Sequence, residues 1–158
     1  MSDDPNASAA DAVNADTATP AQVGLAGWHR VIRDRDPSLL ADLLADDVVF
    51  HSPVVHSPQV GRARTTMYLA GAMQVLGNSS FTYVRQVCQD HDAVLEFRAD
   101  IDGVEVNGVD MITFDDDGRI RDFTVMLRPL KGMQIVRERM AELLAAMAGG
   151  AQEAAHRS

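Results

Sequence analysis

The fold is set by residues 81–127, which read FTYVRQVCQDHDAVLEFRADIDGVEVNGVDMITFDDDGRIRDFTVML. β-Branched and aromatic residues dominate four runs in this segment, and such runs predict strands. The runs cover residues 81–89, 93–101, 104–114 and 120–127. Turns rich in Asp and Gly separate them, at residues 90–92, 102–103 and 115–118. Because connections this short join antiparallel neighbours, the segment predicts a meander of four strands.

Helical patterns lie on both sides of this meander. Thr19-Pro20 is typical of a helix start, and an apolar stripe that includes Trp28 follows it. The predicted helices cover residues 20–34, 38–44, 61–76 and 133–148. The last of them is predicted to end at Gly149-Gly150, and residues 48–52 and 53–61 read as a strand and a loop. This order predicts an α+β domain, with helices packed on one face of a curved antiparallel sheet.

The two ends of the chain differ in composition from the middle. Residues 1–18 contain four Asp, no Lys or Arg, and almost no large apolar side chain. Such a segment cannot offset the entropy of ordering, so it is predicted to be a disordered acidic tail. Residues 19–148 are predicted to form a single domain, and residues 149–158 a flexible C-terminal tail.

Charge and cysteine content exclude several classes of function. The 158 residues have a net charge of −9, with 14 basic against 23 acidic side chains, which argues against binding to nucleic acid or to an anionic membrane surface. The single Cys88 can form neither an internal disulfide nor a cysteine-rich zinc site. No stretch approaches the roughly 18 apolar residues of a membrane span. We therefore expect a soluble protein of the cytoplasm.

Four motifs stand at fixed places among the predicted elements. They are LADDVVF at 44–50 before a strand that ends in Pro53, a helix start at Gly61, GVDMITF at 108–114, and DGRI at 117–120. In this order they resemble the SnoaL-like members of the nuclear transport factor 2-like superfamily, over roughly residues 20–145. The resemblance implies a cone-shaped, cystatin-like fold, a deep pocket between the concave sheet and the helices, and frequently a homodimer.

Asp110 is the first candidate for a functional residue. Both alternating faces of its predicted strand are largely apolar, so an ionised carboxylate there would be costly. Burial would raise its pKa, and a neutral carboxylic acid can donate a hydrogen bond. The structural alternative is that Asp110 caps a neighbouring helix or pairs with an Arg.

The ketosteroid isomerases of this superfamily offer a closer comparison. Aligned with them, Asp110 matches a protonated Asp that polarises a carbonyl, and Trp28 falls where a Tyr would stand. The indole N–H of Trp28 can donate a hydrogen bond but cannot transfer a proton. Ser52-Pro53 replaces the Asp-Pro of the family's base, and because a serine hydroxyl is a poor base at neutral pH, ketosteroid isomerase activity is not expected.

Two histidines flank the position of the missing base. His51 and His56 are candidates to replace it, since the pKa of His suits proton exchange. Strand alternation sends His51 and Ser52 to opposite faces, so only one of the two can face a pocket. The plain alternative is a strand-end His and a solvated loop His. Their spacing and the lack of a third ligand nearby argue against a metal site.

Arg98 is a candidate of a different kind. Arg98-x-Asp100 resembles two members of the epoxide hydrolase site found in this superfamily, but no Asp stands near Val125 to complete it, and Asp122 lies three residues early. The alternative is a solvent-facing row of charges along the strand.

The predicted pocket walls are mostly apolar. They are Phe50, Tyr68, Met67, Met73, Met111 and Met126, with Trp28 and Ser52 as polar positions. The expected ligand is small and apolar or polycyclic. If the protein is an enzyme, we expect a cofactor-independent isomerase, cyclase or dehydratase in which Asp110 assists proton transfer at a carbonyl; the alternative is a non-catalytic binding or dimerisation module.

Overall fold

The predicted meander forms most of a six-stranded sheet in the computed structural model, which describes residues 17–156. Its strands are β3 Thr82–Gln89, β4 Asp92–Ile101, β5 Val104–Phe114 and β6 Ile120–Arg128. Each boundary falls within one residue of its prediction, and all three pairings are antiparallel. Asp102 and Gly103 have φ of 52° and 81°, the left-handed conformation that a tight two-residue hairpin requires. Nearly all of the predicted tail 1–18 lies outside the described residues.

The N-terminal part of the chain extends this sheet by two strands. β1 Leu44–His51 lies parallel to β6, and β2 Gln59–Val60 lies antiparallel to β1, giving the order β2-β1-β6-β5-β4-β3. The predicted loop 53–61 therefore contains a short strand, and the sheet includes one parallel pair. Phe50 and Phe123 are register partners in that pair.

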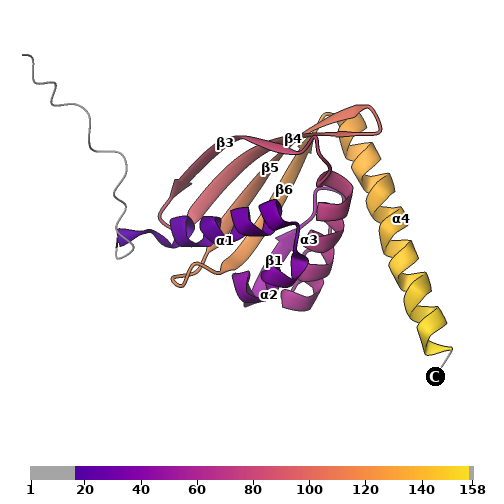
Figure 1. Cartoon of the computed structure of the whole chain (residues 1–158), viewed down its shortest axis with the longest axis horizontal. Helices are drawn as coiled ribbons and strands as arrows, with labels where there is room; N and C mark the ends of the chain where they lie inside the picture. Colours follow the sequence, from indigo (N-terminus) through magenta and orange to yellow (C-terminus); the bar gives the residue numbers. More distant parts are fainter. Residues whose placement is uncertain (1–16, 157–158) are drawn as a thin grey trace, which may run out of the picture.

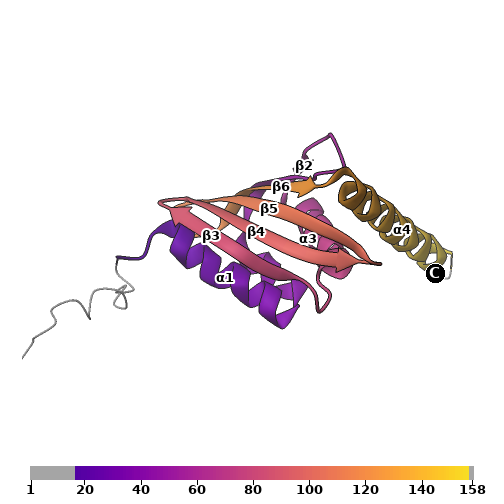
Figure 2. The ribbon, with the colours of Figure 1, turned by 90° about the horizontal axis from the view of Figure 1, so that it is seen from above.

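Helices cover one face of the sheet (Figure 1, Figure 2). They are α1 Pro20–Asp34, a 3₁₀ turn Pro37–Leu39 leading into α2 Leu40–Leu43, α3 Arg62–Leu76 and α4 Leu130–Ala155. The predicted start of α1 is confirmed, because Thr19 and Gln22 form a reciprocal capping box. Leu25, Trp28 and Val31 form part of the buried face of α1, which lies across the sheet. The α+β fold with helices on one face of a curved sheet is thus confirmed.

The sheet separates a buried face from an exposed one. Side chains alternate along β4, so that Leu95 and Phe97 are buried while Val94 and Arg98 point outward. The inward residues of β4, β5 and β6 pack against α1 and α3, and they form the main core together with β1. The face toward the helices is referred to below as the concave face and the opposite one as the outer face.

Helix α4 is longer than predicted. It continues through Gly149 and Gly150 to Ala155, whereas the sequence predicted an end at these glycines. A helical Gly costs only about 1 kcal/mol relative to Ala, which does not by itself stop a helix. Val136 and Met140 are buried near the end of the sheet, and the remainder of the helix projects from the body (Figure 1). Within the described residues, no helix combines the length and apolarity needed to cross a membrane.

Candidate functional site

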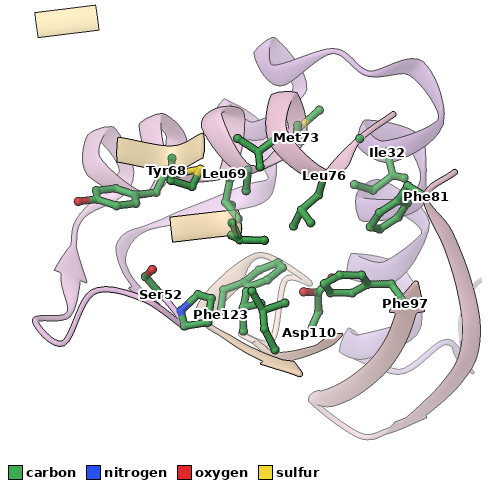
Figure 3. Close-up of a pocket in the computed structure, with 18 of the residues that line it drawn as sticks. Ile32, Ser52, Tyr68, Leu69, Met73, Leu76, Phe81, Phe97, Asp110 and Phe123 are labelled. Carbon is green, nitrogen blue, oxygen red and sulfur yellow. The ribbon is translucent and has the colours of Figure 1, made fainter. Parts of the chain in front are cut away.

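A cavity of about 330 Å³ lies between the concave face of the sheet and the helices. Figure 3 shows Leu69, Met73 and Leu76 of α3 on one side, with Asp110, Phe97 and Phe123 of the sheet opposite them. Most of its lining is apolar, including Ile32, Phe50, Leu69, Met73, Leu76, Phe81, Phe97, Phe123 and Val125. Its size and lining are those of a small-molecule site. The structure thus contains the pocket that the sequence comparison implied.

Asp110 lies on the concave face at the wall of this cavity. In the sheet register it pairs with Leu95 on β4 and with Val125 on β6, and only 5% of its surface is exposed. The hydroxyl of Tyr83 donates a hydrogen bond to Oδ2 of Asp110 at 2.7 Å. Burial raises the pKa of Asp110 to about 7, although the Tyr83 hydrogen bond lowers it in part. At neutral pH the carboxyl group is therefore present in both protonated and ionised forms.

Tyr83 connects Asp110 to Trp28. The Nε1–H of Trp28 donates to the Tyr83 hydroxyl oxygen at 2.9 Å, and Tyr83 donates in turn to Asp110. Burial and the charge of Asp110 together raise the pKa of Tyr83 well above its usual value, so the phenol stays protonated as a donor. Trp28 lines the cavity, as predicted, but its N–H is occupied by Tyr83. It supports the acid through Tyr83 and does not present a free donor to a ligand.

The sequence reading missed Tyr83. This residue lies on the edge strand β3, where an irregularity in the pairing between Tyr83 and Arg85 interrupts the alternation. Its pairing with Phe97 places it on the concave face. The available signal was an aromatic residue with a hydroxyl on a strand beside a buried acid, because a buried tyrosine hydroxyl requires a partner.

The two candidate histidines lie outside the cavity. His51 is on the outer face, where its Nε2 is 3.1 Å from Oδ2 of Asp122, and His56 is exposed in the loop after β1. Neither lines the cavity, so the prediction that a histidine replaces the base there is wrong. Alternation along β1 explains the orientation of His51, since Phe50 and Ser52 face the cavity. The described residues contain no group of three or more His, Cys, Asp or Glu placed to hold a metal ion.

Arg98 is also outside the cavity. It lies on the outer face, 3.9 Å from Glu105 on the neighbouring strand, and Asp100 accepts a hydrogen bond from the backbone of Gly103. Asp122 is on the outer face as well, beside His51. The structure therefore does not bring Arg98, Asp100 and Asp122 together at the cavity, and the prediction of a ligand-binding Arg98 is wrong.

Three of the four methionines proposed as walls are misplaced. Met111 and Met126 lie on the outer face, and Met126 is 58% exposed, because each follows a cavity-facing residue in its strand. Met67 is on the exposed side of α3, whereas Met73 lines the cavity.

Phe50, Ser52 and Tyr68 line the cavity as predicted. Phe50 and Tyr68 are ring neighbours, with centroids 5.9 Å apart. The hydroxyl oxygen of Ser52 accepts a hydrogen bond from the backbone N–H of Val54 at 3.2 Å. This contact leaves the hydroxyl proton of Ser52 available as a donor to a ligand.

These features define a class of protein: an α+β cone with a buried acid at the wall of an apolar, ligand-sized cavity. The chain belongs to the SnoaL-like domain family, whose model matches residues 25–123. A comparison with curated proteins found no match.

Solved structures support the same assignment. A steroid delta-isomerase from Pseudomonas aeruginosa is 42% identical, with a TM-score of 0.79 over 84% of this chain and 96% of that chain. A protein from Silicibacter pomeroyi described as uncharacterized, with a cystatin-like fold, is 32% identical, with a TM-score of 0.74 over 82% and 90% of the two chains. A putative SnoaL-like polyketide cyclase from a Jannaschia species is 10% identical, with a TM-score of 0.60 over 78% and 98%, and shows the fold alone.

Proposed function

We propose that this protein binds a small apolar carbonyl compound in the cavity and exchanges a proton with it through Asp110. The observation that carries this proposal is the Asp110 carboxyl group, which is buried at the cavity wall and has a pKa of about 7. A group whose pKa lies near the working pH is suited to both donating and accepting a proton.

The hydrogen-bond chain suggests how Asp110 would act. In its neutral form, the carboxyl group can donate to the carbonyl oxygen of a ligand and so make the neighbouring C–H bonds more acidic. When that proton has moved to the carbonyl oxygen, the carboxylate left behind keeps its hydrogen bond from Tyr83. It can then accept the proton of the neighbouring C–H bond as that bond breaks, so that the enol forms and Asp110 is protonated again. Trp28 donates to the Tyr83 oxygen and holds the phenol in place. This assigns Asp110 as the catalytic residue and Tyr83 and Trp28 as positioning residues.

The reaction class is isomerisation, cyclisation or dehydration without a cofactor. Each of these can proceed through proton transfer next to a carbonyl group, which the cavity supports with Asp110 alone. The 42%-identical structure is described as a steroid delta-isomerase, which supports a ketone with a movable double bond as the first substrate to test.

Binding without catalysis is the second candidate. Among the residues that line the cavity in the described part of the chain, Asp110 is the sole carboxylic acid and there is no histidine. The family resemblance places Ser52 where ketosteroid isomerases have their base, and the described lining contains no second carboxylate or imidazole to accept a proton. This lining suits a protein that binds its ligand without converting it, with Asp110 only donating a hydrogen bond to the carbonyl group.

A β,γ-unsaturated ketosteroid separates the two candidates. Its conversion to the conjugated ketone is followed by ultraviolet absorbance, and its binding by the fluorescence of Trp28. The sequence alone, with Ser52 in place of a base, does not predict this activity, whereas the buried Asp110 does. We therefore expect turnover by the wild-type protein and a loss of about 10²- to 10⁴-fold in Asp110→Asn, the usual contribution of a general acid or base. Glu105→Gln is the matched control, because it removes a carboxylate from the outer face of the same strand.

The result of that assay is unambiguous in either direction. Binding without turnover, with Asp110→Asn changing the affinity only, would contradict the catalytic proposal and support the binding module. Equal turnover by the wild-type protein and Asp110→Asn would remove Asp110 from the mechanism.

We also propose that the protein is a homodimer in which the outer faces of two sheets meet. Val87, Val94 and Met111 are successive register partners on this face, and Val87 and Val94 are 59% and 37% exposed. Charges of both signs surround this row, including the pair Arg85–Glu96. A surface with an apolar centre and both charge signs at its edge can match a copy of itself across a two-fold axis.

We propose a cytoplasmic location. Cys88, the single cysteine of the chain, is exposed and not in a disulfide, and an exposed thiol of this kind persists in a reducing compartment. Cell fractionation with an antibody against the protein tests this proposal; recovery in a periplasmic or extracellular fraction would contradict it.

A further inference from the structure

Two positively charged side chains line the cavity at the end of helix α1. They are Arg33 and Arg35, and apart from Asp110 they are the charged residues of the lining in the described part of the chain. Both are exposed, so they lie where the cavity meets solvent. Ile32, between Trp28 and these arginines, contributes apolar surface to the same lining. The cavity therefore combines an apolar interior with a cationic edge.

The nearby carboxylates are already engaged. Asp34 lies 3.0 Å from Nε of Arg33 and 3.8 Å from Nε of Arg30. Asp36 accepts hydrogen bonds from the backbone N–H and the hydroxyl of Ser38 at the start of the next turn. Among the described residues, the guanidinium of Arg35 has no hydrogen-bond or ion-pair partner.

The backbone at Arg35 is also unusual. This residue ends α1 in the left-handed conformation, with φ 50° and ψ 36°, a conformation that residues other than Gly, Asn and Asp adopt infrequently. An arginine thus stands at a helix end where glycine is the more common residue. Arg35 is also among the residues that line the cavity.

Other exposed arginines of the described residues, such as Arg64 and Arg121, also have no ion-pair partner, but they do not line the cavity, whereas Arg35 does. Guanidinium groups bind carboxylates through parallel N–H donors, and this pairing gives direction as well as affinity. We propose that the ligand of the cavity carries a carboxylate, which binds Arg35 with Arg33 beside it while the apolar body lies inside. This inference rests on the proposed function and narrows its substrate class to amphipathic carbonyl acids.

Two polar contacts at different places would fix the orientation of such a ligand. Asp110 takes the carbonyl group inside the cavity, and Arg35 takes the carboxylate at the edge. A compound with both groups can then bind in one direction, whereas a neutral ketone keeps only the contact with Asp110. In this arrangement Arg35 at the cavity edge selects ligands with a carboxylate, and Asp110 in the cavity interior exchanges the proton.

Matched pairs of probes test this inference with the full-length protein. The pairs are benzoylpropanoate with its methyl ester, and an oxoandrostene carboxylate with its methyl ester. Binding is measured by Trp28 fluorescence and checked by calorimetry. We expect each acid to bind about five- to tenfold more tightly than its ester, as for a partly exposed charge-assisted hydrogen bond. This preference should shrink as salt is added, since the arginines are exposed.

Variants assign the preference to a residue. Arg35→Gln, and more completely Arg33→Gln with Arg35→Gln, should bring the affinity for the acid down to that for the ester and leave the ester unchanged. Arg35→Lys should retain part of the preference. Arg30→Gln is the control, because Arg30 is on the same helix and also contacts Asp34 but does not line the cavity.

The outcomes separate the two proposals. If the esters bind and the acids have no advantage, or if the advantage survives in the double variant, the carboxylate inference is overturned while the proposed function stands. If neither member of either pair binds, the proposed function fails and this inference fails with it.

Discussion

The Asp110 carboxyl group shows how a fold can bring the pKa of an acid close to neutral pH. Its pKa rises to about 7 because burial removes the water that would stabilise the anion, and one hydrogen bond from Tyr83 offsets only part of this cost. The same carboxylate on the outer face would be fully ionised at pH 7. The cavity therefore contains a proton-exchanging group whose properties come from its surroundings.

Asp110 should make the protein less stable as the pH rises. An Asp has a pKa near 3.8 when unfolded and about 7 here, so between these values the folded state holds a proton that the unfolded state has lost. The contribution of protonated Asp110 to the free energy of unfolding is thus fully present below about pH 4. It is lost as the pH rises to about 7, by about 4 kcal/mol at most. Asp110→Asn should remove this slope.

Urea unfolding of the wild-type protein and Asp110→Asn at pH 5 and pH 8 measures this effect. We expect the variant to gain stability relative to the wild-type protein on going from pH 5 to pH 8. A constant difference between the two proteins would show that the Asp110 pKa is not raised by folding.

Tyr83→Phe should raise the pKa of Asp110 further. The phenol hydrogen bond lowers this pKa in the wild-type protein, and a hydrogen bond to a charged group contributes about 1.5–3 kcal/mol, which corresponds to an increase of about one to two pH units. Carbon-13 NMR of labelled aspartate carboxyls follows the titration directly. Tyr68→Phe is the control, as Tyr68 also lines the cavity without a hydrogen bond to Asp110; an equal change in both variants would contradict the assignment.

Sequence and structure agree at this scale where the signal is local. Asp110 was predictable, because an acid inside an apolar strand is conspicuous by itself. The partner of Trp28 was not, since Tyr83 lies 55 positions away and faces inward through an irregularity in β3. The prediction of Met111 as a pocket wall was avoidable, because the immediate neighbour of Asp110 in a strand must face the other way.

At the scale of elements, α1 depends on one close contact with the sheet. A Cβ added to Gly24 would lie 2.1 Å from the ring of Phe114 and 2.7 Å from the backbone oxygen of Gly118. Phe114 is fully buried, so neither neighbour can withdraw easily. Glycine at this position thus sets how near the helix approaches the strands beneath it.

Gly24→Ala should therefore destabilise the protein, by about 1–3 kcal/mol from overpacking, reduced by up to about 1 kcal/mol of helix propensity. Gly27→Ala is the matched control on the same helix, where the Cβ would meet only the end of the Leu43 side chain, at 2.9 Å. Thermal and urea unfolding of both variants provide the comparison. Equal stabilities would show that α1 can move away from the sheet without cost.

The predicted elements were accurate where turns and strand runs were local. β5 has the predicted boundaries, since Asp-Gly turns mark its ends. The parallel pairing of β1 with β6 was not predictable in the same way, because no turn connects them and only the assembled helices bring them together. The end of α4 was missed because Gly149 and Gly150 were given more weight than the helix propensity of the alanines around them.

At the scale of the whole molecule, the proposed homodimer places the outer faces of two sheets against each other. If two sheets meet there, a charge placed in the apolar row should separate them. Val94→Glu in this row, combined with Met126→Glu on the same outer face, introduces two carboxylates at side chains that are 37% and 58% exposed, so the fold itself should tolerate them.

Analytical ultracentrifugation should find a dimer for the wild-type protein and a monomer for this double variant, with unchanged circular dichroism. Val23→Glu is the control, because Val23 is 50% exposed on α1, away from the outer face. A wild-type monomer at micromolar concentration, or a double variant that remains dimeric, would refute the proposed interface.

The position of β1 in the sheet also affects how the chain is made. β1 comes early in the sequence but pairs with the last strand to be synthesised, and it brings together His51 and Asp122, which are 71 positions apart. Contacts of such long range are slow to form, whereas the hairpins between them are local. On the ribosome, α1, α2, β1 and α3 are therefore synthesised before β6, the strand with which β1 pairs. Until β6 is available, the apolar side chains of β1, such as Val48 and Phe50, which are buried in the folded protein, stay exposed in the nascent chain. Exposed apolar surface of this kind promotes aggregation, so we expect the chain to bind chaperones during synthesis.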